Sequence, residues 1–352
     1  MKEFWSKRIQ NITPYTPGEQ PKDRQFIKLN TNECPYPPSP KVLAAIQEAA
    51  DGRLRLYPDP ECSELRQAIA KREGLKPEQV FCGNGSDEIL AFAFQAFFDP
   101  DKDVVFPKIT YSFYPVYTDF FGLNRREVPM NPDFSDPVDL LCGKNGGVVL
   151  ANPNAPTGIA VGLDVVEQIL QANPGVAVIV DEAYIDFGAD SAVGLISKYP
   201  NLLVVQTASK SRALAGLRVG WAMGNENLTA ALRCVRDSTN SYTLDRLAQS
   251  GAKAAIEDEI YFQATRQKVI DARTWTERTL KEHGFTVLPS QANFLFVSHP
   301  AHSGRELLDG LRQRGILVRW WDKPEIENWL RVSIGTREEM GALVKALEEL
   351  IL

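Results

Sequence analysis

The feature of this 352-residue sequence that most limits its fold is a series of short apolar runs separated by helix-like stretches. The runs at 103–106, 147–151, 176–180 and 202–206 are dominated by Val, Ile, Leu and Phe and do not alternate with polar residues. Such strands are typically buried on both faces, as in a parallel sheet that carries helices on each side. We therefore predict an α/β fold.

The remaining N-terminal pattern is consistent with that fold. Further strand-like runs occur at 79–82, 126–129 and 217–223. Apolar residues recur with helical spacing in four further segments, at 41–50, 61–73, 86–98 and 162–171. The two prolines of RLYPDP separate the first two of these helices and predict a loop there.

The C-terminal third has a different pattern. Residues 243–283 contain few breakers and predict either one extended helix or two in series, long enough to bridge two domains. Strands are expected at 285–289, 293–298, 316–320 and 329–334, with helices at 304–314 and 337–351. We expect an N-terminal arm, 1–28, to pack with a small C-terminal α+β domain, 266–352, and residues 29–265 to form the large domain.

Composition excludes several kinds of site. The five cysteines are odd in number and none forms a CxxC pair, which favours reduced thiols that bind no metal. The three histidines all lie in the last fifth of the chain, so a histidine-based triad or metal cage has little to build on. The net charge of −6 comes with no basic stripe, and we expect no nucleic-acid partner.

The chain also lacks membrane and export signals. Its apolar runs are far shorter than the roughly 20 residues that a bilayer crossing requires. Residues 1–10 have no apolar stretch of the kind found in a secretory signal. We expect a cytoplasmic protein with no membrane partner.

Two segments at predicted strand ends could carry chemistry. GNGSDE (83–88) follows a strand and opens a helix, so its backbone amides could bind phosphate, although taken alone it is better explained as an ordinary turn capped by Ser86. DEAY (181–184) ends the most apolar strand, where open α/β sheets place ligands. Its acid is either the partner of a cationic ligand atom or a helix cap.

Three other segments are ambiguous when taken alone. SKSRALAGLR (209–218) holds one lysine among small residues, which is either an amine nucleophile or a solvated loop lysine. NPNAPTG (152–158) is at least a rigid turn. Arg319 and Arg331 suit carboxylate or phosphate binding, but taken alone they are expected to pair with surface acids such as Glu325 or Glu327.

Taken together and in this order, these residues resemble the fold-type I aminotransferases that depend on pyridoxal phosphate, and among them the histidinol-phosphate aminotransferase group. The strings that carry the resemblance span nearly the whole chain: LNTNECPYPPSP (29–40), YPDPECSELRQAIA (57–70), GNGSDEIL (83–90), NPNAPTG, VDEAYIDF (180–187), SKSRALAGLRVGW (209–221) and WLRVSIGTREE (329–339). The resemblance implies a large domain with a mostly parallel seven-stranded sheet and a smaller α+β domain.

It also implies catalytic roles. Lys210 is expected to form the internal Schiff base with pyridoxal phosphate and then to move the proton of the substrate's Cα. Asp181 is expected to hold the pyridine nitrogen protonated, which makes the ring a better electron sink. Tyr184 is expected to donate a hydrogen bond to the ring's phenolic oxygen.

Further residues are expected to hold the cofactor. Tyr111 resembles the aromatic residue that stacks on the ring. The expected phosphate cradle consists of the amides of Ser86 and Asp87 with Ser209, Arg218 and Thr207. Tyr57 resembles a tyrosine that the second subunit lends to the same phosphate, which implies a homodimer.

One position departs from the family pattern. An asparagine commonly stands directly before PTG and donates to the phenolic oxygen, whereas this chain has Ala155 there. Asn154 comes one residue too early for a simple correspondence. We keep it as a cofactor-binding candidate and expect the oxygen to depend more on Tyr184.

The resemblance implies that Arg331 and Arg319 bind the phosphate of the substrate and the carboxylates of the co-substrate. Tyr15 and Asn32 are expected near the substrate. Packing is the ordinary role for Trp320 and Trp321, but either one facing the pocket would make aromatic substrates plausible.

The implied reaction converts L-histidinol phosphate and 2-oxoglutarate into imidazole-acetol phosphate and L-glutamate, in histidine biosynthesis. An aromatic amino-acid aminotransferase and a threonine-phosphate decarboxylase are alternatives of the same fold. An effector-binding sensor would need a helix-turn-helix module, for which residues 1–28 are too short. A nicotinamide-binding Rossmann enzyme would need a GxGxxG fingerprint, which GNGSDE does not match.

Overall fold

The apolar runs form one seven-stranded sheet in the computed structural model, which describes residues 3–352. The order is β2-β8-β7-β6-β5-β3-β4, and β8 alone is antiparallel to its neighbours. The strands are β2 (Val80–Gly83), β3 (Val104–Pro107), β4 (Arg125–Val128), β5 (Gly147–Ala151), β6 (Val178–Asp181), β7 (Leu202–Thr207) and β8 (Gly220–Gly224). The predicted α/β fold with a mostly parallel sheet is confirmed.

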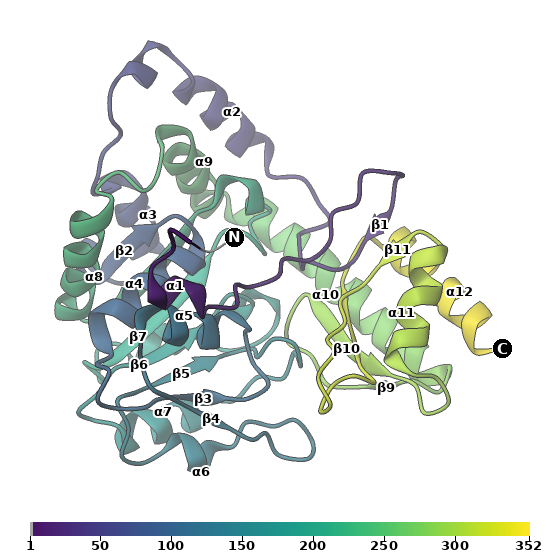
Figure 1. The fold of residues 1–352 in the computed structure, drawn as a ribbon. Coiled ribbons are helices and arrows are strands. Elements are labelled where there is room, and N and C mark those ends of the chain that lie inside the picture. Colours follow the sequence, from purple (N-terminus) through teal and green to yellow (C-terminus); the bar gives the residue numbers. More distant parts are fainter. Residues whose placement is uncertain (1–2) are drawn as a thin grey trace.

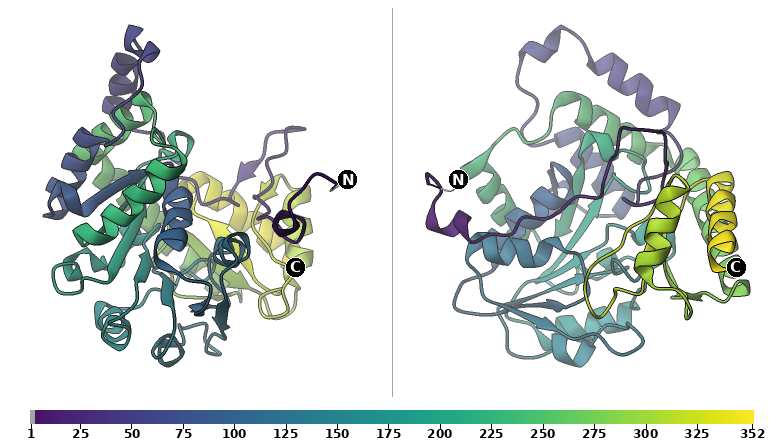
Figure 2. Two further views of the ribbon diagram at one scale, coloured as in Figure 1. Left: turned by 60° about the vertical axis from the view of Figure 1, so that its left-hand side comes forward. Right: turned by 45° about the vertical axis from the view of Figure 1, so that its right-hand side comes forward.

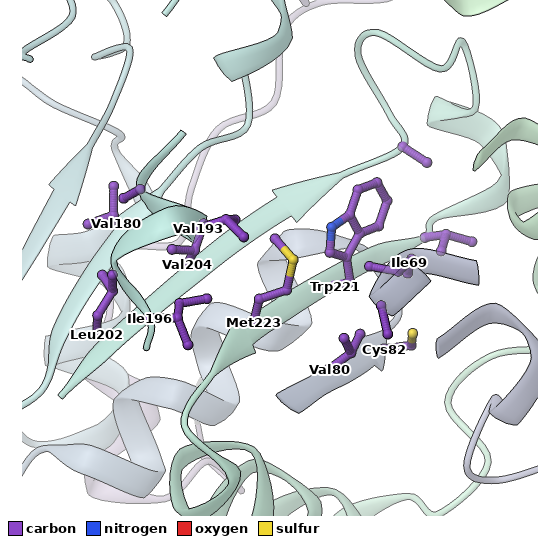
Figure 3. Packing of buried hydrophobic residues seen from close by; sticks show 14 of the residues in the cluster. Ile69, Val80, Cys82, Val180, Val193, Ile196, Leu202, Val204, Trp221 and Met223 are labelled. Carbon is purple, nitrogen blue, oxygen red and sulfur yellow. The ribbon is translucent and has the colours of Figure 1, made fainter. Parts of the chain in front are cut away.

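Successive residues of the central strands pack into different cores because side chains alternate across a sheet. Val178 and Val180 contribute to one apolar cluster, while Ile179 between them contributes to the other. Figure 3 shows part of the first cluster, where Val180, Leu202, Val204 and Met223 lie close together. Burial on both faces explains the absence of polar alternation in these runs.

Helices cover both faces of this sheet (Figure 1). The first cluster includes residues of α2 (Pro40–Ala49), α3 (Ser63–Glu73), α7 (Leu163–Ala172) and α9 (Arg246–Glu257). The second includes residues of α4 (Gly85–Phe97), α5 (Phe113–Phe121) and α8 (Glu226–Thr239). The remaining helices of this part are short. Two are single-turn α-helices, α1 (Lys7–Gln10) and α6 (Val138–Leu141). Five are 3-10 helices: η1 (Gly52–Arg55), η2 (Pro77–Gln79), η3 (Ile185–Phe187), η4 (Ala192–Leu195) and η5 (Ala215–Leu217).

A second, smaller sheet lies in the C-terminal part. Its three antiparallel strands are β9 (Thr286–Val287), β10 (Phe294–Ser298) and β12 (Leu330–Ser333). They share an apolar core with α10 (Glu259–Glu282), α11 (Gly304–Gln313) and α12 (Arg337–Ile351). Near this core, β1 (Ile27–Lys28) pairs in parallel with β11 (Ile316–Leu317). The N-terminal segment therefore adds a strand beside the C-terminal part.

Most of the predicted elements are present, with some corrections. The segment 243–283 forms two helices in series, α9 and α10. No helix was expected at α5 or α8, and the strands predicted at 285–289 and 316–320 shrink to two residues each. The sequence of α5, FYPVYTDFF, consists largely of aromatic and β-branched residues with a proline, which are poor helix formers, and burial of its aromatic face outweighs that preference.

The N-terminal arm contacts both parts of the chain. Arg24 donates to the backbone carbonyl of Arg312, and Glu19 forms an ion pair with Arg312 at 2.8 Å. Tyr15, by contrast, stacks on Phe113 of α5, with ring centroids 4.3 Å apart. Residues 1 and 2 of the predicted arm lie outside the described residues. The domain limits stay a prediction, and α10 runs without interruption across residue 265.

Figure 2 shows that α2 and the segment that follows it protrude from the rest of the molecule in both views. Within residues 3–352, no helix combines the length and the apolar character that crossing a bilayer would require.

We expect Arg273→Met to lower the free energy of unfolding by about 2–4 kcal/mol, because it leaves two buried carbonyls without their charged donor. Arg273 lies on α10, is 8% exposed and donates through Nη1 to the carbonyls of Phe187 (2.9 Å) and Ala292 (2.7 Å). Calorimetric unfolding of both proteins would measure the difference.

The matched control is Arg278→Met on the same helix, since the Arg278 side chain is 71% exposed and its nearest acidic partner, Glu282, is 3.9 Å away. Its effect should stay within about 0.5 kcal/mol. Equal effects of the two substitutions would contradict the bridging role of Arg273.

Candidate active site

A cavity lies where the carboxyl ends of β5, β6 and β7 face the beginning of α4, between the large sheet and the C-terminal part. Ala151, Asp181 and Thr207 line it from these three strand ends. Parallel strands end at one edge of a sheet, so polar residues that follow different strands converge there. This convergence brings together DEAY and SKSRALAGLR, which are separated in the sequence.

Asp181 lies deepest among the acidic groups of the cavity and is only 5% exposed. The Tyr114 hydroxyl donates to Oδ2 at 2.8 Å, and the Ala183 amide donates to Oδ1 at 3.3 Å. Burial raises the pKa of Asp181 to about 6, and the hydrogen bond from Tyr114 opposes that rise. No ion pair reaches this carboxylate within residues 3–352, so it lacks a bonded cation.

Lys210 follows β7 and lies partly buried in the cavity. Its Nζ donates to the Thr31 carbonyl at 3.3 Å and lies 5.6 Å from the centre of the Tyr184 ring. The edge-to-face contact of Tyr184 with Phe294, with centroids 5.0 Å apart, fixes that ring. The amine, the phenol and the Asp181 carboxylate therefore line one cavity.

The part of the cavity beside the beginning of α4 is suited to an anion. Helix α4 begins there at Gly85, its N-cap residue Asn84 makes no side-chain capping bond, and Ser86 and Asp87 line the cavity. The positive end of a helix with free amides favours an anion. Gly85 has φ +79°, and a Cβ there would lie 2.6 Å from Arg218 Nη2. Only glycine allows the guanidinium to come so close.

Side chains around this end form a connected set. Arg218 donates from Nη2 to Asp87 Oδ2 at 3.0 Å and from Nη1 to Ser209 Oγ at 3.4 Å. Thr207 donates from Oγ1 to Ser209 Oγ at 3.0 Å. Tyr111 donates to Asp87 Oδ1 at 2.7 Å, and burial is the main reason that the pKa of this phenol is raised well above its usual range.

Arg319 and Arg331 lie side by side across an isolated antiparallel bridge. Arg319 Nη2 donates to the Thr16 carbonyl at 2.9 Å, and Arg331 Nη2 donates to the Asn30 carbonyl at 3.0 Å. Among residues 3–352, Arg331 Nε is buried and has no hydrogen-bond partner. Neither guanidinium forms an ion pair with a carboxylate of residues 3–352, so the pair remains available to an anionic ligand.

Trp321 packs against both arginines. Its ring centre lies 5.5 Å from the Arg319 guanidinium carbon and 5.2 Å from that of Arg331. The face of an indole attracts cations, which offsets part of the repulsion between the two charges. Trp320 points to a different environment, where its Nε1 donates to the Glu327 carbonyl and Arg305 lies over its ring. Neither indole lines the cavity.

Three consecutive residues of the N-terminal segment complete the wall. Asn30 binds Arg331, Thr31 binds Lys210, and Asn32 Nδ2 donates to the Tyr184 hydroxyl at 3.1 Å. Tyr15 also lines the cavity. Tyr15 and Asn32, which the sequence predicted near the substrate, thus line the same cavity, and their contact with a substrate stays a prediction.

Two predicted residues lie outside the cavity lining. The amide of Asn154 is buried and satisfied, because it donates to the Ile109 carbonyl (2.9 Å) and Thr157 Oγ1 (3.1 Å) and accepts from Thr110 Oγ1 (2.9 Å). Ala155 lines the cavity in its place. Tyr57 is 77% exposed and stacks on Tyr242, with centroids 4.5 Å apart.

The sequence did not predict several of the contacts around the cavity. Tyr114 holds Asp181 from α5, a helix that was not expected. Thr31 and Asn30 act through backbone carbonyls, which any residue carries.

Comparison with known proteins gives consistent matches. The family model for aminotransferase class I and II matches residues 24–347. A histidinol-phosphate aminotransferase of Acinetobacter baumannii (strain SDF) is 53% identical over 353 residues, covering 99% of this chain and 98% of that protein. One from Clostridium acetobutylicum is 52% identical over 351 residues and the full length of both chains.

Among solved structures, the histidinol-phosphate aminotransferase of Sinorhizobium meliloti in complex with pyridoxal-5'-phosphate has a TM-score of 0.89. It is 26% identical and the match covers 99% of this chain and 97% of that one.

We expect Asp181→Asn to change how stability depends on pH in the cofactor-free protein. Because the folded-state pKa of Asp181, about 6, lies above its ordinary value of 3.8, the wild type loses stability as pH rises between these values. The stability difference should shift in favour of the variant by up to about 3 kcal/mol between pH 4 and pH 7. Urea unfolding at several pH values would measure it.

The buried Glu182, whose pKa burial raises to about 7, is present in both proteins and cancels in the difference. If the free energy of unfolding changed with pH in the same way in variant and wild type, the burial of an ionisable carboxyl at position 181 would be contradicted.

Proposed function

The chain belongs to the aminotransferase class I and II family, and we propose that it transfers the amino group of L-histidinol phosphate to 2-oxoglutarate. The products are imidazole-acetol phosphate and L-glutamate, in a step of histidine biosynthesis. Identity of 53% over nearly the full length of a histidinol-phosphate aminotransferase supports this assignment. The observation that carries it is the pair of arginines without carboxylate partners at one side of a cavity that also holds a lysine.

The cavity fits pyridoxal phosphate as the cofactor. Asp181 is a buried carboxylate that lacks a bonded cation, which a protonated pyridine nitrogen would supply. The helix start at Ser86 and Asp87, together with Arg218 and Ser209, would hold the phosphate. When bound, pyridoxal phosphate supplies an aldehyde for the amine of the substrate and a ring that accepts electrons from its Cα.

Lys210 is the residue that would carry the cofactor through Nζ. With its Nζ free and neutral, Lys210 would act as a base within the cavity that takes a proton from the substrate and returns it. The Thr31 carbonyl, which accepts from Nζ at 3.3 Å, orients the amine. Tyr184 would donate to the ring oxygen and Tyr111 would contact the ring.

The arginine pair would bind the anionic group of each substrate in turn. A guanidinium presents several N–H donors in a plane and can pair with either a phosphate or a carboxylate. The unpartnered Nε of Arg331 is an available donor. Tyr15 and Asn32 lie beside this pocket and would contact or enclose the substrate.

An aromatic amino-acid aminotransferase or a threonine-phosphate decarboxylase would use the same cofactor residues. A tryptophan facing the pocket would have favoured aromatic substrates, but Trp320 and Trp321 do not line the cavity. Histidinol phosphate therefore remains the substrate that we propose.

We also propose a homodimer. The protruding segment after α2 exposes Leu54 (57%), Leu56 (49%) and Tyr57 (77%), an unusual concentration of apolar surface. A second copy could cover these residues, and the family resemblance implies that Tyr57 would then contact the cofactor phosphate of the partner. A cytoplasmic location is proposed on the five cysteines, all of which are unpaired in the structure.

The reaction is tested by supplying the purified protein with 2-oxoglutarate and, separately, L-histidinol phosphate, phenylalanine and threonine phosphate. We expect glutamate to form fastest with histidinol phosphate. Lys210→Ala should lower that rate by about 10²–10⁴-fold or more, and should abolish the covalent attachment of the cofactor to position 210 that borohydride reduction of the imine produces. Faster turnover of phenylalanine, or carbon dioxide release from threonine phosphate, would favour the corresponding alternative.

Arg331→Met should raise KM for histidinol phosphate about 10- to 100-fold, since a charge-assisted hydrogen bond is worth about 1.5–3 kcal/mol. KM for 2-oxoglutarate should rise as well, because one pocket serves both anions. Steady-state kinetics would measure both constants. Arg305→Met, which removes an arginine over Trp320 outside the cavity, is the matched control and should leave them unchanged; unaltered KM values in Arg331→Met would place the anion pocket elsewhere.

A further inference from the structure

We propose that Asn32 is a positioning residue that sets the direction in which the Tyr184 hydroxyl donates its hydrogen. Resting on the proposed function, this assigns to Asn32 a role in tuning the cofactor site, in addition to its place beside the substrate pocket. The inference follows from the hydrogen bonds around three residues: Asn32, Ser333 and Tyr184.

The backbone of Asn32 is held on both sides. Its amide donates to Ser333 Oγ at 2.8 Å, and its carbonyl accepts from Asn293 Nδ2 at 3.0 Å. The residue is 1% exposed and has φ +57°, a left-handed conformation that asparagine adopts more readily than most residues. Asn32 therefore has little freedom to move relative to the cavity.

Ser333 fixes which end of the Asn32 amide faces the tyrosine. The serine hydroxyl already accepts the backbone N–H of Asn32, and it donates its single hydrogen to Asn32 Oδ1 at 2.8 Å. Oδ1, the acceptor atom of the Asn32 amide, is therefore bonded to Ser333 on β12. The donor end, Nδ2, is left to face Tyr184, whose hydroxyl oxygen lies 3.1 Å away.

A tyrosine hydroxyl has one hydrogen to donate and lone pairs that accept. Because Nδ2 of Asn32 occupies a lone pair, the hydrogen cannot be directed to Asn32. The hydroxyl of Tyr184 has no other hydrogen-bond partner among residues 3–352. Its hydrogen is therefore available to an acceptor in the cavity, such as an oxygen on the cofactor ring.

The side chains of two neighbouring asparagines, Asn154 and Asn30, donate to groups other than Tyr184. All polar atoms of the Asn154 side chain are satisfied by Thr110, Ile109 and Thr157, and Ala155 carries no polar side-chain atom. Asn30 uses its Nδ2 on the Glu19 carbonyl at 2.9 Å. Asn32 is the amide that the structure places against Tyr184.

Ser333 lies two residues from Arg331 on the same strand, β12. The chain of bonds from Ser333 through Asn32 to Tyr184 thus links the strand that carries the anion-binding arginine to the phenol beside Lys210. A shift of that strand would therefore change the position of the Asn32 amide that donates to the Tyr184 hydroxyl.

The test compares Asn32→Asp with Asn32→Gly in the holoenzyme, and follows the pH titration of the visible absorbance of the bound cofactor. Both replacements tolerate the positive φ, so backbone strain is small. A carboxylate at this position would accept the tyrosine hydrogen and withdraw it from the cavity. We expect the midpoint in Asn32→Asp to rise by about one pH unit, with a smaller rise in Asn32→Gly.

A double-mutant cycle with Tyr184→Phe separates positioning from charge and from general disruption. If Asn32 acts through the phenol, the shift caused by Asn32→Asp should fall to less than about a third in the Tyr184→Phe background. An equal shift in both backgrounds would overturn the proposal, because it would reflect the added charge alone.

Ser333→Ala provides a second route should Asn32→Asp fold poorly. It frees the amide of Asn32 to rotate, and we expect an intermediate rise in the same midpoint with KM for histidinol phosphate changed less than kcat. No rise in Ser333→Ala would count against the proposal. Failure of the proposed function is a different result, since wild-type protein would then form no glutamate from histidinol phosphate and 2-oxoglutarate.

Discussion

The contact on which the active cavity depends is made by three consecutive residues of an N-terminal segment. Asn30, Thr31 and Asn32 bind Arg331, Lys210 and Tyr184 respectively. These three targets come from different parts of the chain and have different chemistry: a cation, an amine and a phenol. The segment is itself anchored on β12, where Ser333 donates its backbone amide to the Leu29 carbonyl at 2.9 Å. One short segment therefore sets the relative positions of three groups that line the cavity.

The site also holds ionisable side chains in surroundings that disfavour their charged forms. Burial of Asp181 disfavours its charged form, and the cavity places Arg319 beside Arg331 without an acidic partner. The protein supports both arrangements with neutral groups, the Tyr114 hydroxyl in the first case and the Trp321 ring in the second. Unfavourable electrostatics of this kind are relieved when a ligand of opposite charge binds, which is why they cluster at functional sites.

Much of this arrangement followed from the sequence. The buried strands β5, β6 and β7 were predicted because a strand covered on both faces needs no polar alternation, and residues after such strands meet at one sheet edge. The helix α5 was missed because local preferences of its aromatic residues do not favour a helix. Asn154 was a candidate from its place in a motif, yet its side chain is satisfied within its own loop and Ala155 lines the cavity.

The sequence by itself determined the layered α/β architecture and the identity of the residues with reactive or charged groups, because periodicity and residue chemistry are local properties. The tertiary structure decided which carbonyl orients Lys210, which tryptophan supports the arginines and which amide faces Tyr184. Those contacts join residues as far apart as Asn32 and Ser333, separated by 301 positions. Side-chain direction at such distances is set by how whole elements pack, and no local pattern in the chain records it.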